Sequence, residues 1–422
     1  MARPQPLPAT ASDFSPVDLT SVATACAADE KACWEVFDKI LHVAESKYAH
    51  EIHLEAEPDC LRIRFRSAFE MVERRIIERY EYDKVLALLK RQLWGVDADA
   101  HSARGWFYFT VASNRSLFQM DIVKASSGES VLLTQLDESW LPPSKLEEIG
   151  LSRIQLATLK RALQARQGLI VIASDVPQAR RRTARAITQQ LIAPDKKLIV
   201  AETPVHPHLP RTTQMAMDFP ATQLQTEKWE ALCRLGSDAI INTQTLDAES
   251  ARWLINQAAE QTLVVSSVAC GSASAALGKL LSLGVRSETL AHCFSTIVTQ
   301  HRVRCLCPHC RHSVAPDDEA TVWLAKHSPM HAGNVNDWLR ARMRSSFGDA
   351  QGCEQCNHTG CRSWLDIFDV ISVDSELKDT LYDSDYQYAF AQLEHKSTLI
   401  ETLLKLASEG IISLDEAIRV TR

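Results

Sequence analysis

Four short apolar runs, separated by helical stretches, constrain the fold of this chain more than any other feature. They are GLIVIA at 168–173, KLIVAE at 197–202, DAIINT at 238–243 and LVVSSV at 263–268. Such short apolar runs are typical of parallel strands that are buried on both faces. The intervening stretches, such as ARAITQQLI and AESARWLINQAAE, carry helical periodicity. The alternation predicts a doubly wound α/β domain with a parallel sheet.

The region before this domain combines a helix with several strands. The stretch CWEVFDKILHVAESK places apolar residues at helical spacing and predicts an amphipathic helix beginning near Lys31. LRIRFR at 61–66 alternates strictly between apolar and basic residues, which predicts a strand paired with 50–55. Further strands near GWFYFTVA and SVLLTQL complete an α/β domain that ends around Trp140.

Composition shifts divide the rest of the chain. The first 30 residues mix Pro, Ser, Thr and Ala without apolar periodicity, which is typical of a mobile arm. Cysteines and histidines gather after about residue 304, and helical patterns return after Trp364. We therefore expect a mobile arm (1–30), an amino-terminal α/β domain (31–140), the doubly wound domain (141–303), a Cys-rich subdomain (304–362) and a carboxy-terminal helical region (363–422).

Charge, apolar patterning and cysteine content indicate the cellular compartment and the kind of partner. No run of about 18 apolar residues occurs and the start lacks the pattern of a signal peptide, so we expect a cytoplasmic protein. The formal net charge is -7 and Lys and Arg are scattered, which argues against nucleic acid as a partner. Twelve cysteines in a reducing compartment are expected to be thiols and metal ligands rather than disulfides.

Two CxxC pairs predict a metal site. Cys307 and Cys310 form one pair, and Cys353 and Cys356 form the other. Each pair can place two thiolates about 2.3 Å from one Zn²⁺, and four sulfurs leave no position for water, so a structural zinc is expected. The alternatives are unrelated pairs, a redox dithiol, or a zinc-dependent nucleic-acid binder, which the acidic balance disfavours. The neighbouring residues expected to be bystanders are Cys305, Cys361, His309, His312 and His358.

Several segments carry a resemblance to one family. TQHRVRCLCPHCRH and GCEQCNHTGCRSWLDIFDV are similar to the motifs QRLxRxLCxxC and GCxxCxxTGYxGRxGIFEV, and ASEGIISLDEAIRVTR is similar to GITTLEEVLRVT. AHEIHLEAEPDCLRIRFR resembles SDIHxEP followed by LRxRxRxDG. These are signatures of type II secretion and type IV pilus assembly ATPases of the PilB/GspE type, and the resemblance covers about residues 31–422. It implies a PAS-like amino-terminal domain, a RecA-like core, a zinc-bearing subdomain and a hexamer that meets an inner-membrane platform protein.

The phosphate-binding loop that this resemblance implies lacks its required residues. Such a loop reads GxxxxGK[ST], because glycines let N–H groups face the phosphates, Lys reaches the β and γ groups and Ser or Thr binds Mg²⁺. Here Ser174 and Ala179 replace the two glycines. Arg180 stands where Lys belongs and Arg181 where the hydroxyl belongs. ATP is therefore not expected to be a working cofactor.

Other catalytic motifs are also altered. In the segment similar to LRxDPDxIxxGExRD, Gln244 replaces the catalytic Glu, and an amide cannot act as a general base. Glu202 is the one carboxylate left where the family has IEDPxE, and TLVVSSVACGS lacks both histidines of HLxLSTLHTND. Asp238 and Asp247 persist, and we expect them to be helix caps or surface charges.

These replacements beside intact apolar strands favour a folded pseudo-ATPase that serves as a scaffold or regulatory subunit of a type IV pilus or type II secretion apparatus. The alternative is a weak or unconventional ATPase that uses Arg180 and Glu202, with Asp238 as a further residual nucleotide contact. The expected partners are an active paralogous assembly ATPase and an inner-membrane platform protein, in a homo- or hetero-oligomer. Through such a partner the chain is expected to lie at the inner membrane.

The basic strand at 61–66 suggests where a partner binds. Side chains alternate along a strand, so its three arginines share one side while its apolar residues face the core. In the family this strand belongs to the domain that closes over nucleotide at a subunit boundary, where arginine can stabilise phosphate charge. The residues expected to face the partner are Arg62, Arg64 and Arg66.

Overall fold

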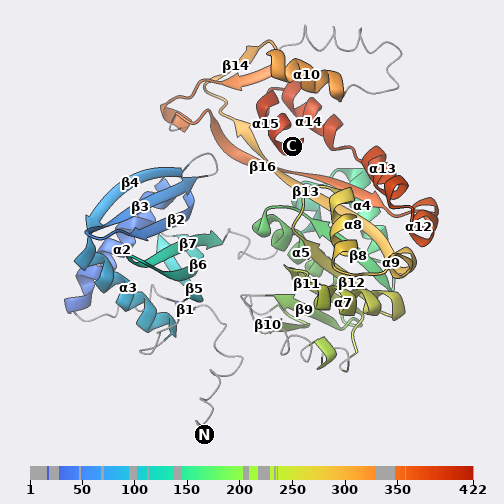
Figure 1. Cartoon of the computed structure of the whole chain (residues 1–422), viewed down its shortest axis with the longest axis horizontal. Helices are drawn as coiled ribbons and strands as arrows, with labels where there is room; N and C mark the ends of the chain where they lie inside the picture. The colour runs from blue at the N-terminus through green and yellow to red at the C-terminus, as the bar shows by residue number, and fades with distance from the viewer. Residues whose placement is uncertain are drawn as a thin grey trace. The chain divides into compact units, whose positions relative to one another are not determined.

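A computed structural model of the protein describes residues 17–18, 28–46, 49–67, 71–94, 102–111, 114–136, 145–202, 209–216, 229–231, 234, 236–327, 347–356 and 358–421. These residues form two compact units, one within 17–136 and the other within 145–421 (Figure 1). None of the helices in this part of the chain is long and apolar enough to span a membrane.

The amino-terminal unit is a seven-stranded sheet with two helices packed on it. Its strand order is β1-β5-β6-β7-β2-β3-β4, and every neighbouring pair except β1 and β5 is antiparallel. The elements are β1 (Val17–Asp18), α2 (Ala28–Ser46), β2 (Ala49–Ala56), β3 (Cys60–Ser67), β4 (Met71–Glu78), α3 (Arg79–Trp94), β5 (Ser102–Val111), β6 (Asn114–Ala125) and β7 (Gly128–Leu136).

The helix expected near Lys31 is confirmed as α2, and its apolar stripe fills the core of this unit. Trp34 and Phe37 are buried and pack on Phe109, with ring centroids 6.3 and 5.4 Å away. The predicted strands at 50–55 and 61–66 are β2 and β3, which pair antiparallel. Hydrophobic burial of this kind holds small α/β units together, at about 25 cal/mol per Å² of apolar surface.

Part of the segment expected to be a mobile arm is described. Val17 pairs with Phe107 as a short parallel strand, and α2 already begins at Ala28. The remaining arm residues, 1–16 and 19–27, lie outside the described part of the chain.

The carboxy-terminal unit contains the doubly wound sheet. Its order is β10-β9-β11-β12-β8-β13-β16, with all neighbours parallel except β13 and β16. The four apolar runs are confirmed as β8, β9, β11 and β12. The strands are β8 (Gly168–Ala173), β9 (Leu198–Glu202), β10 (Thr212–Ala216), β11 (Ala239–Thr245), β12 (Leu263–Val268), β13 (Phe294–Leu306) and β16 (Cys361–Ser372).

Helices cover both faces of this sheet. Along β8, Leu169 and Val171 join a core with α7, α8 and α9, whereas Ile170 and Ile172 join a second core with α4 and α5. Two separate cores on alternate residues of one strand are what a doubly wound sheet requires, so the α/β, RecA-like fold class is confirmed. The helices are η3 (Leu146–Glu148), α4 (Arg153–Ala162), α5 (Pro177–Leu191), α7 (Ala248–Glu260), α8 (Ala273–Ser282) and α9 (Ser287–Cys293).

The strands β13 and β16 extend from the sheet into the Cys-rich region. Around them a further core joins Trp323, Phe347 and Leu403. The expected boundaries at 303 and 362 fall within these two strands, so the Cys-rich segment and the terminal helices share one core. The remaining elements are β14 (Arg311–Val314), α10 (Asp318–Lys326), β15 (Phe347–Ala350), η4 (Glu354–Cys356), α12 (Ser375–Tyr382), α13 (Tyr386–Lys396), α14 (Leu399–Ser408) and α15 (Leu414–Thr421).

Candidate functional site

The turn after β8 occupies the position of the expected phosphate-binding loop. It contains only Ser174, Asp175 and Val176, because α5 begins at Pro177. The Ser174 N–H donates to the carbonyl of Val268 at 3.3 Å, and the Val176 N–H donates to the Ser174 hydroxyl at 3.3 Å. Pro177 has no N–H. Three backbone positions that could have faced phosphates are therefore engaged or lack a donor.

Arg180 folds back over this turn. The side chain is 5% exposed, and its Nη1 donates to the Ser174 carbonyl oxygen. Burial lowers the pKa of the guanidinium, and the negative charge of Asp175 opposes that shift. A guanidinium still remains charged at neutral pH. The cation that stands in the place of the phosphate-binding Lys is thus directed at the protein's own backbone.

Glu202 belongs to a second buried charge cluster at the same edge of the sheet. It is 2% exposed and accepts a hydrogen bond from Gln214 Nε2 at 2.9 Å. Burial raises the pKa of this carboxyl to about 7, although the nearby Arg185 and Arg181 lower it. Because β11 and β12 separate β9 from β8, the strands bearing Glu202 and the turn are about 14 Å apart. Arg180 and Glu202 therefore lie in different clusters.

The other acidic-motif residues are spread over two ends of the sheet. Gln244 lies near the carboxyl end of β11, where its N–H donates to Asn242 Oδ1 at 3.2 Å. Asp238 precedes β11 at the opposite end and accepts from the Lys197 N–H at 2.7 Å. Asp247 caps α7 by accepting from the Ser250 N–H at 2.7 Å, which confirms the expected cap. Asp238 is thus not part of the cluster around the turn.

Two residues beside the turn were not expected from the sequence. Gln300 follows the pairing of Thr299 with Ala173, and its Oε1 accepts from the Thr183 hydroxyl at 2.6 Å. His301 comes next on β13, and burial lowers the pKa of its imidazole. Gly271 separates this histidine from Asp175: a Cβ there would lie 2.9 Å from Asp175 Oδ2 and 3.7 Å from His301 Cε1. No local motif identifies these residues, because a strand pairing distant in sequence brings them here.

The four cysteines of the two CxxC pairs meet at one point. Their sulfurs all lie within 4.8 Å of one another. The Cys307 and Cys353 Sγ atoms are 3.9 Å apart, and Cys310 and Cys356 Sγ are 3.8 Å apart. Four thiolates placed about 2.3 Å from one tetrahedral ion would be separated by about 3.8 Å. The donor set and spacing therefore fit a single metal ion held by four sulfurs.

Backbone geometry keeps the second pair in place. Gly352 has φ +88°, and a Cβ there would lie 2.5 Å from the His358 carbonyl oxygen, so a side chain is excluded. His358 itself has φ 62° at a turn and is exposed, and exposed His309 contacts Arg362. His309, His358 and Cys305 do not belong to the four-sulfur group, in line with their expected role as bystanders. The same holds for Cys361 and His312.

The three arginines of β3 form ion pairs with glutamates of β2 and of the turn that follows it. Arg62 Nη2 lies 2.7 Å from Glu57 Oε1, and Arg66 Nε lies 2.8 Å from Glu51 Oε2. Arg64 forms an ion pair with Glu55. Each arginine is between one third and one half exposed, so such pairs contribute only about 0–1 kcal/mol each. A partner could therefore compete for these arginines at small cost.

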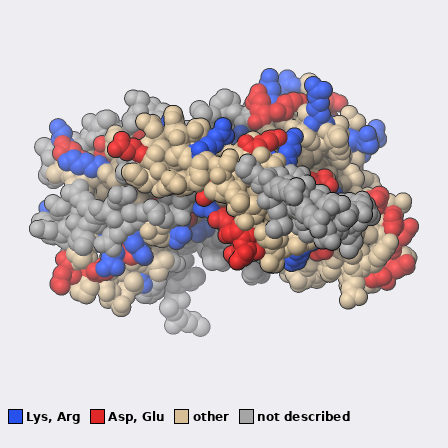
Figure 2. Space-filling view, turned by 90° about the horizontal axis from the view of Figure 1, so that it is seen from above, with Lys and Arg blue, Asp and Glu red and all other residues tan. Residues whose placement is uncertain are grey.

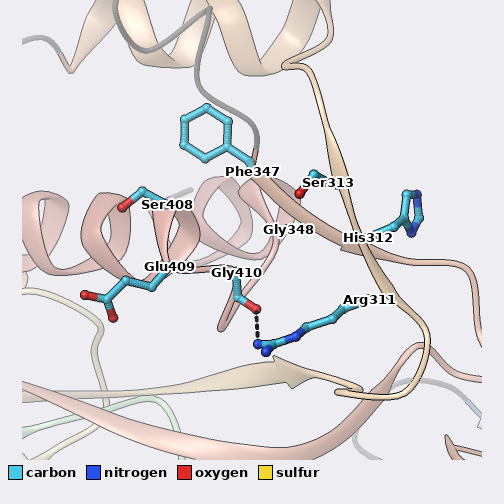
Figure 3. Close-up of a pocket in the computed structure, with 8 residues that line it drawn as sticks. All are labelled: Arg311, His312, Ser313, Phe347, Gly348, Ser408, Glu409 and Gly410. Carbon is cyan, nitrogen blue, oxygen red and sulfur yellow. Dashed lines mark hydrogen bonds between the residues drawn. The ribbon is translucent and has the colours of Figure 1, made fainter.

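A hollow of about 260 Å³ lies between β14, β15 and the turn after α14 (Figure 3). Arg311 Nη1 donates across it to the Gly410 carbonyl at 3.3 Å. Figure 3 shows His312 and Glu409 directed away from each other, so the charged groups do not converge on one point. A Cβ at Gly348 would lie 2.7 Å from Gly410 Cα, which explains why glycine is needed in this close contact. We therefore interpret the hollow as a result of the packing between these elements and not as a ligand site.

Comparison with known proteins places this architecture in a family. The family described as Type II/IV secretion system protein matches residues 27–419. The putative type II secretion system protein E of Escherichia coli K12 is 24% identical over 421 residues, covering 96% of this chain and 81% of that protein. The type IV pilus assembly ATPase PilB of Thermus thermophilus is 23% identical over 297 residues, covering 70% of this chain and 32% of that protein.

Solved structures show the same fold at low identity. The Legionella pneumophila ATPase DotB aligns with a TM-score of 0.62 and 13% identity, covering 96% of this chain and 97% of that one. The pilus retraction motor PilT, solved with bound ADP, aligns with a TM-score of 0.58 and 12% identity, covering 91% and 96%. The family match spans nearly the whole chain, and the α/β fold agrees with it. This chain belongs to the Type II/IV secretion system protein family.

Proposed function

We propose that this protein is a catalytically inactive member of its family that acts as a scaffold or regulatory subunit of a type IV pilus or type II secretion apparatus. The observation that carries the proposal is the closed turn after β8, where the buried Arg180 donates to the Ser174 carbonyl instead of facing solvent. Phosphate binding by such a turn depends on free N–H groups and a cation aimed outward. Gln244 also lacks the chemistry of a general base.

Calorimetry with ATP and Mg²⁺ tests the proposal directly. We expect no binding heat with this chain, while an active assembly ATPase of the same family measured in the same buffer binds. A micromolar dissociation constant for this chain would overturn the proposal, because it would require the turn to open for phosphate.

A weak ATPase is the competing function, and one observation favours it. Glu202 has a pKa raised to about 7 and lies near two arginines, a setting that could serve a general base. Phosphate release by the wild type and by Glu202→Gln and Arg180→Ala separates the two functions. Turnover that both substitutions abolish would establish the ATPase, whereas no turnover above a buffer blank supports the inactive role.

Two further parts of the proposal concern the metal and the partners. We assign the four-cysteine site to a structural zinc, since four thiolates at this spacing leave no open coordination position. The proposed partners are an active paralogous assembly ATPase and an inner-membrane platform protein. The arginines of β3 are the proposed contacts with the paralogue, because they are partly exposed and held only by surface ion pairs.

A further inference from the structure

Three exposed tyrosines mark a surface formed by α12 and α13. Tyr382 ends α12, and Tyr386 and Tyr388 lie in the first turn of α13. Their exposed fractions are 67%, 38% and 50%. All seven residues from 382 to 388 are exposed. Aromatic side chains are enriched at protein interfaces, so a group of exposed tyrosines points to a binding surface rather than to a scattered residue.

This surface is held in one conformation. Ser384 has φ 60°, which is uncommon for a residue with a side chain, and its hydroxyl lies 3.0 Å from that of Ser287 on α9. The Tyr386 hydroxyl donates to the Ser287 hydroxyl at 3.3 Å. The Tyr388 hydroxyl donates to Glu376 Oε1 at 2.9 Å. A surface ordered before binding loses little conformational entropy when a partner arrives.

Carboxylates surround the tyrosines. Residues 374–396 contain six Asp or Glu and two Lys, and one of these lysines, Lys396, pairs with Asp374. In Figure 2 Asp and Glu predominate over Lys and Arg at the right-hand edge, the side on which Figure 1 draws α12 and α13. The exposed acids that lie among the tyrosines are Glu376, Asp379, Asp383 and Asp385. We call these four acids and the three tyrosines the acidic tyrosine surface.

An unsatisfied acceptor lies behind this surface. Gln392 on α13 is 9% exposed, and its Nε2 donates to Glu376 Oε1 at 3.0 Å. Its own Oε1 is buried and has no hydrogen-bond partner among the described residues. Buried acceptors are normally paired, so this oxygen still requires a donor, which can reach it only if docking next to Glu376 uncovers it. That requirement is independent of the surface charge, and it points to a hydrogen-bond donor as ligand.

We propose that the acidic tyrosine surface docks a Lys- or Arg-rich segment of a partner protein. Guanidinium and ammonium groups stack on tyrosine faces and pair with neighbouring carboxylates, so one cation can use both features of the surface. The negative charge also speeds encounter with a basic segment and repels nucleic acid. This inference goes beyond the proposed function, since the surface belongs to α12 and α13 and not to the turn after β8.

Fluorescence anisotropy with a labelled twelve-residue peptide of alternating Arg and Ser tests the docking. We compare the full chain with Tyr382→Ala and with the double variant Asp379→Asn/Asp383→Asn. Each is expected to raise the dissociation constant at least tenfold, because these side chains supply stacking and charge. None of the three residues caps a helix at its amino end, so both variants are expected to fold, which circular dichroism verifies.

The matched control is Glu401→Gln/Glu409→Gln, which removes the same charge from exposed positions on and after α14. It is expected to change the dissociation constant less than twofold. Equal weakening by both double variants, or no effect of Tyr382→Ala, would overturn the proposal by reducing the binding to bulk charge. Tyr382-dependent dimerisation in analytical ultracentrifugation, with no peptide binding, would also overturn it, because the occupant would then be a second copy. Neither outcome depends on ATP binding.

Discussion

At the scale of single residues, Arg180 and Glu202 are the side chains whose environments differ most from those of an open phosphate site. Arg180 is buried and bonded to its own turn, and Glu202 is buried with a pKa near neutrality. Both states are set by burial, which disfavours charge. Substituting either residue should therefore change the free energy of unfolding, which can be measured without any nucleotide.

Replacing Arg180 with Ala is expected to lower the free energy of unfolding by about 2 kcal/mol. The change removes a charge-assisted hydrogen bond and leaves the buried Ser174 carbonyl without that donor. Urea unfolding measures it. The control Arg161→Ala, at an exposed position of α4, is expected to change stability by less than about 0.5 kcal/mol. Equal effects of the two substitutions would show that Arg180 is not bound as described.

Stability is expected to fall as pH rises across the range between the unfolded and folded pKa of Glu202. The folded pKa is raised from 4.5 to about 7, so the native state holds the proton after the unfolded chain has released it. The stabilisation is complete below pH 4.5 and is lost as pH passes 7, an effect of up to about 3 kcal/mol. Glu202→Gln is expected to reduce the difference in unfolding free energy between pH 5 and pH 8 by about this amount. An unchanged difference would refute the assignment.

At the scale of elements, the two CxxC pairs beside β13 and β16 bring together residues far apart in sequence. Cys307 follows β13 directly, and its N–H donates to the Gly360 carbonyl, one residue before β16, at 2.7 Å. The metal site is thus built on the ends of two paired strands. Metal loss should loosen those ends and the helices that share their core.

We expect one zinc per chain in protein purified without chelator, and well under one in Cys310→Ser, because a thiolate ligand is lost. Elemental analysis gives the stoichiometry. The melting temperature should fall in the ligand variant, but the shared core with α14 and α15 should keep the fold. The control Cys361→Ser is expected to retain full zinc. Equal metal content in both variants would rule out the four-cysteine site.

The sequence predicts the elements whose residues carry a local signal. β8 and β12 are short, mostly apolar runs, and the spacing of the two CxxC pairs is typical of a zinc site, so the strands and the cysteine site were predictable. β13 and β16 were missed, because their polar residues are matched by partners distant in sequence. Arg302 pairs with Asp366 at 3.0 Å, and Arg304 binds Glu416, which is 1% exposed. Such long-range pairs leave no periodicity, and for the same reason His301 could not be placed beside the turn.

At the scale of the whole molecule, the chain carries two proposed contact surfaces on separate units. The β3 arginines belong to the amino-terminal unit, and the acidic tyrosine surface belongs to the carboxy-terminal one. A subunit with two different contact surfaces can join two different neighbours, which suits a scaffold. Substituting the arginines and measuring the activity of a partner ATPase tests this idea.

The ATPase rate of an active paralogue is expected to change when this protein is added. Arg62→Ala/Arg64→Ala/Arg66→Ala should abolish the change, because the arginines would no longer be available to the neighbour's phosphates. A phosphate-release assay measures the rate. The control Arg153→Ala/Arg161→Ala/Arg166→Ala, at exposed positions of the other unit, should behave as the wild type. Equal rates in every mixture and for the paralogue alone would exclude a trans-acting role.

The long ladder between β13 and β16 has a mechanical consequence. Eleven residue pairs, from Thr296 with Ser372 to Leu306 with Cys361, join these strands from the core sheet to the two CxxC pairs. Leu306 and Cys361 lie at the same end of this ladder, so a pull on the cysteine site along the strand axis acts on both strands in the same direction. The hydrogen bonds that resist it together, in shear, are those that join β13 to β8 between Phe294–Thr299 and Leu169–Ala173. The segment that carries the four cysteines is therefore anchored to the core sheet through two strands at once, and force applied there reaches β8 without first separating β13 from β16.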